Sequence, residues 1–151
     1  SIYFYIWGIS CQQAVNKLEK DHRFQIVAYH HKTEVVQKRS LLAATDLNKK
    51  KVKDFVNNLA AFGGTEHEAG LISALSFKPD VIMLLTDGGY PPLNGTQLRT
   101  LKRIARNRTQ IHCVMFGSGP LQDGDNFMAK LARQNEGSFK YINVDRWLLK
   151  K

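Results

Sequence analysis

Short apolar runs alternate with segments of helical periodicity along the whole chain, and this alternation limits the possible folds more than any other feature. The strongest run, Val81-Ile-Met-Leu-Leu-Thr86, contains no polar residue before its last position. Strands at the centre of a parallel sheet are buried on both faces, so they are apolar throughout rather than at every second position. We therefore expect residues 81–86 near the middle of a parallel sheet with helices on both faces.

The other runs complete a doubly wound order. Residues 33–36 follow the second strand after only two residues, too few for a parallel crossover, so this strand is expected to pair antiparallel at an edge. The sequence predicts one domain over residues 1–151, a three-layer α/β/α Rossmann-like fold whose sheet is mainly parallel with one antiparallel edge strand. The remaining expected strands are residues 2–7, 24–30, 111–116 and 139–143, and the expected helices are residues 11–20, 46–59, 66–76, 96–107 and 126–134, with Asp46 and Thr65 as N-caps.

Composition excludes several protein classes. With 43% hydrophobic and 23% charged residues, the chain is typical of a soluble globular protein. A membrane-spanning helix needs about 20 consecutive apolar residues, and no stretch approaches that length, so no transmembrane segment is expected. Cys11 and Cys113 are expected to be unpaired, because the fourth strand should separate the first strand from the fifth.

The charge balance is strongly basic. Twenty-two Lys and Arg residues oppose thirteen Asp and Glu residues, a formal net charge of +9. Arg99, Arg103 and Arg106 recur at i, i+4 and i+7 on one helix, and Lys102 extends this stripe. A solvated helix face accounts for such a stripe, but so does a module that binds nucleic acid or an anionic surface. No aromatic residues lie among them, so stacking on single-stranded bases is not indicated.

Candidate ligand-binding residues follow the strands, because ligands of such sheets bind outside the carboxyl ends. Asp87 follows the central strand, and Thr65 precedes a helix; a carboxylate and a hydroxyl suit Mg²⁺. Alternatively, Asp87 caps the turn at Gly88-Gly89, and Thr65 only caps its helix. Phosphate-loop, nucleophile-elbow and zinc-protease motifs are lacking, and a metal-dependent hydrolase centred on Asp87 is the weakest alternative, so the chain is predicted not to be an enzyme.

One glycine-rich turn also needs interpretation. Gly117-Ser-Gly119 follows a strand and precedes a helix, which hints at a dinucleotide-binding loop. Gln122 occupies the position of the third glycine, however, and the helix begins several residues later. We expect a tight turn here.

Two long stretches resemble the centre of a von Willebrand factor A-type domain, namely Phe62-Gly-Gly-Thr-Glu-His-Glu-Ala-Gly-Leu-Ile-Ser-Ala-Leu75 and Lys78-Pro-Asp-Val-Ile-Met-Leu-Leu-Thr-Asp-Gly88. Residues 111–117 and 126–139 are similar to the last strand-helix-strand unit of bacterial members. The resemblance extends from about Phe24 to Asp145. It implies a metal-ion-dependent adhesion site, which in this family combines a D-x-S-x-S loop after the first strand, a Thr before a helix and an Asp after the central strand.

This chain matches that site only in part. Thr65 and Asp87 match the Thr and the Asp, and Ser10 takes the place of the first motif serine. Gly8 then stands in place of the loop aspartate, and Gln12 in place of the second serine. A site with fewer carboxylates compensates poorly for dehydrating the ion. The resemblance therefore implies weak binding of Mg²⁺ or another divalent cation.

The resemblance also implies a function. Members of this family are binding modules, so we expect a non-enzymatic module that recognises a protein partner at the carboxyl edge of the sheet, with Glu66, Gly88 and Gly89 among the contacts. The alternative is the basic module for nucleic acid or an anionic surface, with Arg99, Lys102, Arg103 and Arg106 as its anion-binding residues.

Overall fold

The computed structural model of the protein describes residues 2–6, 19, 23–29, 33–35, 42–58, 67–86, 91–106, 108–122, 124–143 and 145. The predicted helix over residues 11–20 lies outside this part, apart from residue 19. No helix among the described residues is long and apolar enough to cross a membrane. The strands are β1 (Ile2–Ile6), β2 (Arg23–Tyr29), β3 (Thr33–Val35), β4 (Leu42–Ala43), β5 (Val81–Thr86), β6 (Gln110–Gly117) and β7 (Phe139–Asn143), and the helices are α2 (Asp46–Asn58), α3 (His67–Ser76), α4 (Gly95–Ala105) and α5 (Phe127–Gln134).

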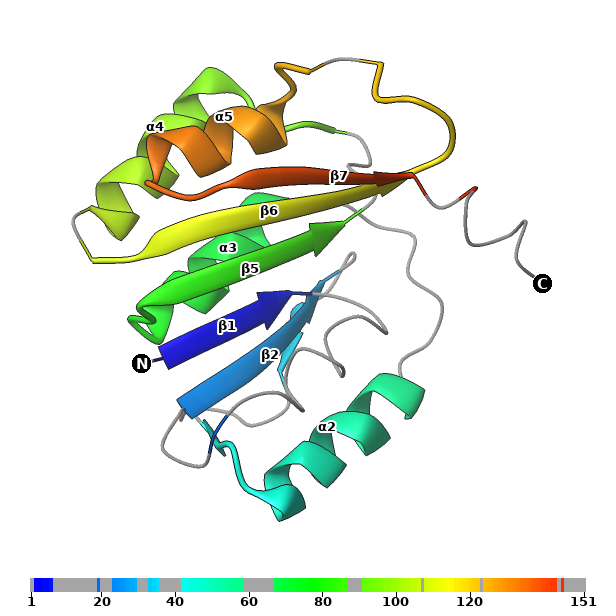
Figure 1. Ribbon diagram of the computed structural model, residues 1–151. Coiled ribbons are helices and arrows are strands. Elements are labelled where there is room, and N and C mark those ends of the chain that lie inside the picture. Colours follow the sequence, from blue (N-terminus) through cyan, green and yellow to red (C-terminus); the bar gives the residue numbers. More distant parts are fainter. Residues whose placement is uncertain are drawn as a thin grey trace.

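The strands form one sheet in the order β3-β2-β1-β5-β6-β7 (Figure 1). Parallel pairing joins β1 to β2 and to β5, β5 to β6, and β6 to β7. β3 pairs antiparallel with β2 at the edge. The predicted parallel sheet, the interior position of β5 and the antiparallel edge strand are all confirmed.

A second antiparallel strand, β4, was not predicted, so the expectation of a single one is wrong. Leu42–Ala43 pairs with Arg23 and Phe24 of β2, whose other side is occupied by β1. β3 and β4 therefore follow one another along the same outer side of β2. A strand of two residues has no periodicity that a sequence could display. It is defined by its backbone pairing and by the burial of Leu42.

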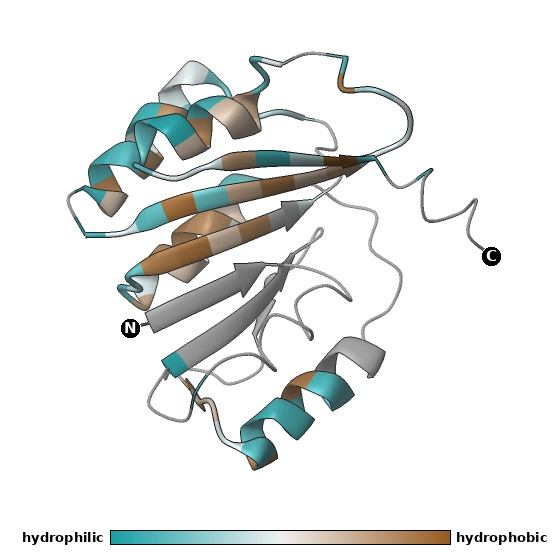
Figure 2. Cartoon of the chain, in the orientation of Figure 1, coloured by the Kyte–Doolittle hydropathy of each residue, from teal (hydrophilic) through white to brown (hydrophobic). Residues whose placement is uncertain are grey.

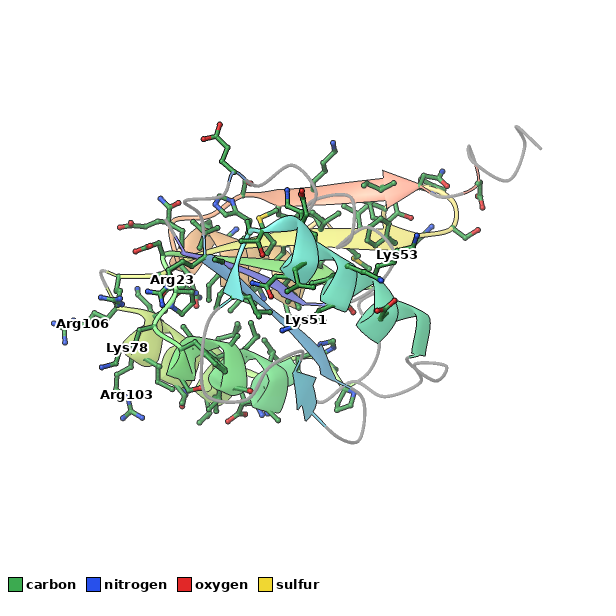
Figure 3. All side chains as sticks on the ribbon, turned by 90° about the horizontal axis from the view of Figure 1, so that it is seen from below. Arg23, Lys51, Lys53, Lys78, Arg103 and Arg106 are labelled. Atoms are coloured by element: carbon green, nitrogen blue, oxygen red, sulfur yellow. The ribbon has the colours of Figure 1, made fainter. Side chains whose placement is uncertain are left out.

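The main core lies between the sheet and helices α3, α4 and α5, which cover one face, while α2 lies on the other side beside β2 (Figures 1 and 3). Figure 2 shows hydrophobic residues on β5 and β6 and hydrophilic ones on the outer side of α4. Fully burying one large aliphatic side chain contributes about 1.5 to 3 kcal/mol. The largest core side chains with no exposure are Leu71 of α3, Ile82 and Leu84 of β5, Leu101 of α4, Ile111 of β6, and Met128 and Leu131 of α5.

Side-chain caps define the helix starts. Asn94 accepts a hydrogen bond from the Gln97 backbone N–H (2.8 Å), and the Gln97 side chain accepts one from the Asn94 N–H (2.9 Å). This capping box begins α4 at Gly95. The prediction of Asp46 as the cap of α2 is wrong, because the Asn48 N–H donates to the Thr45 hydroxyl (3.3 Å). Asp46 instead lies in the first turn, where the negative charge of a carboxylate interacts favourably with the positive end of the helix dipole.

The turns that enter β5 and β6 are tied together. The Arg108 guanidinium donates from Nε (3.2 Å) and Nη2 (2.9 Å) to the carbonyl oxygen of Lys78, whose φ is +53°. The Thr109 hydroxyl donates to the carbonyl oxygen of Pro79 (2.6 Å). These bonds hold Lys78 in the left-handed region that non-glycine residues rarely adopt.

Gly137 lies where the chain leaves α5 and passes against β6. Its N–H donates to the Ala132 carbonyl (2.8 Å), and a Cβ added here would lie 1.7 Å from the Ile111 carbonyl oxygen. We expect Gly137→Ala to destabilise the fold by about 3 kcal/mol or more, since β6 would have to shift. Gly124→Ala is the control, because a Cβ there meets no atom within 4 Å. Urea unfolding will measure both, and equal midpoints would contradict the close approach.

Candidate functional site

The carboxyl edge of the sheet is the candidate site. Parallel pairing brings the ends of β1, β5 and β6 to this one edge, with Ile6 opposite Leu84 and Thr86 opposite Met115. Thr86, the last residue of β5, is buried. The structure thus places side by side the two strands that precede the predicted ligands. The metal-binding candidates Ser10, Thr65 and Asp87, and the partner-binding candidates Glu66, Gly88 and Gly89, lie outside the described residues.

Among the described residues, no group of three or more His, Cys, Asp and Glu side chains is placed to hold a metal ion. His67, at the start of α3, has 1% of its surface exposed. Its ring centroid lies 5.0 Å from that of Phe127 in α5, at an interplanar angle of 44°. His67 therefore packs in the core between α3 and α5. Sequence analysis missed this role because the contact joins residues 60 positions apart.

A cavity of about 880 Å³ opens at this edge, between the start of α4, α5 and the segment that follows β6. Its apolar lining includes Leu98 of α4, Met115 of β6 and Phe127 of α5. Gln122 and Lys130 add polar groups. The cavity thus combines apolar surface with a few polar groups, as ligand and side-chain pockets usually do.

The turn Gly117-Ser-Gly119 contributes Gly117 and Ser118 to the lining of this cavity and is closed by a carboxylate. Asp145 accepts the Ser118 hydroxyl at Oδ1 and the Gly119 N–H at Oδ2, both at 2.7 Å. Gly119 has φ +73°, which favours glycine. Because Asp145 occupies these donors, they are not directed at a phosphate group, and the predicted tight turn is confirmed. No sequence motif predicted that Asp145 would bind this turn.

Two reactive residue types in β6 also have structural roles. The Ser138 N–H donates to His112 at Nδ1 (3.0 Å), which joins β6 to the segment before β7. Cys113 is free and buried, and burial raises the pKa of its thiol far above the ordinary value. The predicted unpaired Cys11 lies outside the described residues.

The arginine-rich stripe of α4 is exposed, as predicted, but it does not behave as a unit. Arg99 donates from Nη2 to the Thr96 hydroxyl (3.1 Å) near the start of the helix. Arg106 lies at the opposite end, about 10 Å further along at 1.5 Å per residue. Lys102 and Arg103 belong to the last turn. Three of the four residues therefore lie toward the amino edge of the sheet, away from the candidate metal site.

Comparisons with known proteins agree on one family. The family model described as the von Willebrand factor type A domain matches residues 11–141. Among curated proteins, none matches this chain. The structure is similar to that of a von Willebrand factor type A protein from Catenulispora acidiphila (TM-score 0.78, 19% identity), covering 99% of this chain and 39% of that one. The chain thus spans less than half of that relative.

Two further solved structures share the fold. The conserved hypothetical protein BatB from Bacteroides thetaiotaomicron has a TM-score of 0.67 and 11% identity, over 99% of this chain and 93% of that one. Proximal thread matrix protein 1 from the mussel byssus has a TM-score of 0.62 and 16% identity, over 98% of this chain and 42% of that one. That structure has zinc in its metal-ion-dependent adhesion site (MIDAS) motif. Identities this low show the fold alone.

We expect the Cys113 thiol to be unreactive in the folded protein, because it is buried and its pKa is raised. In a Cys11→Ser variant, Ellman's reagent at pH 8 should modify Cys113 at least about 100-fold more slowly than in denaturant. The variant keeps one thiol, so the signal is unambiguous. Equal rates in native buffer and in denaturant would show that β6 is accessible.

Proposed function

This chain belongs to the von Willebrand factor type A domain family, and from that premise we propose that it is a non-enzymatic binding module that recognises a protein partner at the carboxyl edge of its sheet. Domains of this family are generally interaction modules. The fold is that of the family, with the ends of β1, β5 and β6 together at one edge. Neither the family match nor the structural neighbours indicate a nucleic-acid partner.

The observation that carries this proposal is the cavity at that edge. Its apolar lining of Leu98, Met115 and Phe127 suits an apolar side chain of a partner, and Gln122 and Lys130 can bond to polar groups of the same partner. Buried anchors surrounded by polar contacts supply most of the affinity in protein interfaces. The cavity adjoins the turn that follows β6, and our proposal adds Glu66, Gly88 and Gly89 to the contacts of the same partner.

The metal site belongs to the same edge in this proposal. Ser10, Thr65 and Asp87 are hard oxygen donors, the type that Mg²⁺ prefers. The donor set fits in kind but not in charge, because Asp87 is its single carboxylate and Gly8 replaces the loop aspartate. When bound, the ion would offer a coordination position to an oxygen atom of the partner. The chain's own residues would hold that ion weakly, and the cavity would carry most of the recognition.

Capture experiments test the binding proposal. The immobilised protein should capture a partner protein from a lysate of its source. The Met115→Arg variant should not capture this partner, because a long cationic side chain in the cavity blocks an apolar anchor. Lys51→Glu, an exposed change on α2, is the control and should retain it. If both variants retain the same proteins, the cavity is not the binding surface. Repeating the capture with a chelator will show whether an ion contributes.

We expect divalent cations to bind no more tightly than about millimolar, the weak end of the range for poorly charged sites. Isothermal titration with Mg²⁺ and Mn²⁺ will measure this. Restoring the family pattern with Gly8→Asp and Gln12→Ser should tighten binding at least about tenfold, since it adds a carboxylate and a hydroxyl. Asp87→Ala in the restored variant should abolish the gain. Micromolar binding by the unaltered chain would contradict the single-carboxylate site.

A further inference from the structure

Six exposed basic residues gather at the amino edge of the sheet, opposite the candidate metal site. This edge collects the start of β2, the turn before β5, the end of α4 and the start of β6, because parallel strands begin at one edge and α4 returns to it (Figure 1). Figure 3 labels four of them at the same end of the molecule. We name this surface the basic edge, and its residues are Arg23, Lys78, Lys102, Arg103, Arg106 and Arg108.

None of these six side chains forms a salt bridge with a carboxylate of the described residues. The salt bridge that this part of the chain contains joins Arg133 to Asp125 (3.2 Å) and includes no residue of the basic edge. Arg108 donates to the Lys78 carbonyl oxygen, a neutral acceptor that leaves both side chains charged. Uncompensated like charges destabilise a compact state through self-repulsion. The basic edge therefore carries a charge excess that an acidic ligand would relieve.

The helix dipole accounts for only part of this cluster of basic residues. Lys102 and Arg103 lie in the last turn of α4, where cations interact favourably with the helix dipole. The dipole effect of α4 falls off within that turn, so it does not reach Arg23. Lys78 lies two residues past the end of another helix, α3, and its N–H donates to the Leu75 carbonyl oxygen (2.9 Å). Arg23 begins β2, which is two strand spacings or about 10 Å from β5.

A cavity of about 480 Å³ opens within the basic edge. Lys102, Arg106 and Arg108 line it, together with the carboxylates Asp80 and Glu136. Guanidinium groups bind carboxylates through two parallel hydrogen bonds, and Arg106 offers such a group in this cavity. Arg108 already donates from Nε and Nη2 to the Lys78 carbonyl oxygen, so Arg108 and Lys102 add mainly positive charge.

We propose that the basic edge binds an acidic segment of a partner protein. The carboxylates Asp80 and Glu136 oppose a continuous run of phosphates, whereas a polypeptide places its negative charges apart and can avoid them. The side chains of Gln110 and Gln134, also in the cavity lining, can bond to a peptide backbone. The residues described as lining this cavity include no aromatic ring on which a base could stack. This surface is separate from the carboxyl edge and does not depend on the proposed metal.

Fluorescence anisotropy with a labelled peptide of alternating Glu and Ala residues tests the proposal. Replacing Lys102, Arg103 and Arg106 together by Gln should weaken binding at least about tenfold, because it removes the close charge pairs that these side chains would form with carboxylates of the peptide. The control replaces Lys50, Lys51 and Lys53 of α2 by Gln, which removes three charges from exposed positions on another helix. Figure 3 shows Lys51 and Lys53 away from the labelled residues of the basic edge. The control should stay within about twofold of the unaltered protein. Thermal unfolding of both variants will verify that each remains folded.

Other outcomes overturn the proposal. Equal weakening in both variants would mean that net charge alone attracts the peptide. If a Gln-Ala peptide binds as tightly as the Glu-Ala peptide, carboxylates have no role in recognition. If a thymidine oligonucleotide binds more tightly than the Glu-Ala peptide, and the variant at Lys102, Arg103 and Arg106 loses that binding, the surface binds nucleic acid. The Met115→Arg and Asp87→Ala variants should bind the Glu-Ala peptide normally. Loss of binding in either would place the acidic peptide at the carboxyl edge instead.

Discussion

The burial of β5 between β1 and β6 is the constraint on which the rest of the structure depends. Ile82 and Leu84 have no exposed surface, and they contact the core formed with α3, α4 and α5. Because β5 is paired in parallel on both sides, β1 and β6 start at the same edge of the sheet as β5 and end at the same opposite edge. That shared direction creates two distinct edges, and each of the two proposed binding surfaces lies at one of them.

The two edges differ in chemistry. At the carboxyl edge, strand ends meet a cavity with apolar and polar lining, and Asp145 closes the turn after β6. At the amino edge, turns held by Arg108 and Thr109 meet the cationic end of α4. A module with two separated surfaces can hold two partner segments at once, and such linkage raises the overall affinity without new contacts at either surface.

Sequence patterns predicted the long elements well. The continuous apolar run at residues 81–86 and the two-residue break before Thr33 indicated both the interior strand and the antiparallel edge, and both are present. Local signals were less reliable where two neighbouring residues can play one role, and Thr45 rather than Asp46 caps α2. β4 escaped prediction because two residues show no period, and Asp145 because it binds a turn 26 and 27 positions away in the sequence.

The sequence by itself determined the fold class and the family, because hydrophobic periodicity and short motifs are local properties of the chain. Only the tertiary structure decided which distant groups meet. It packed His67 against Phe127, engaged the donors of Ser118 and Gly119 with Asp145, and placed Arg103 and Arg106 of α4 at the same end of the molecule as Lys78 and Arg23 (Figure 3). These contacts arise from sheet register and helix packing, which bring together residues that no sequence spacing relates.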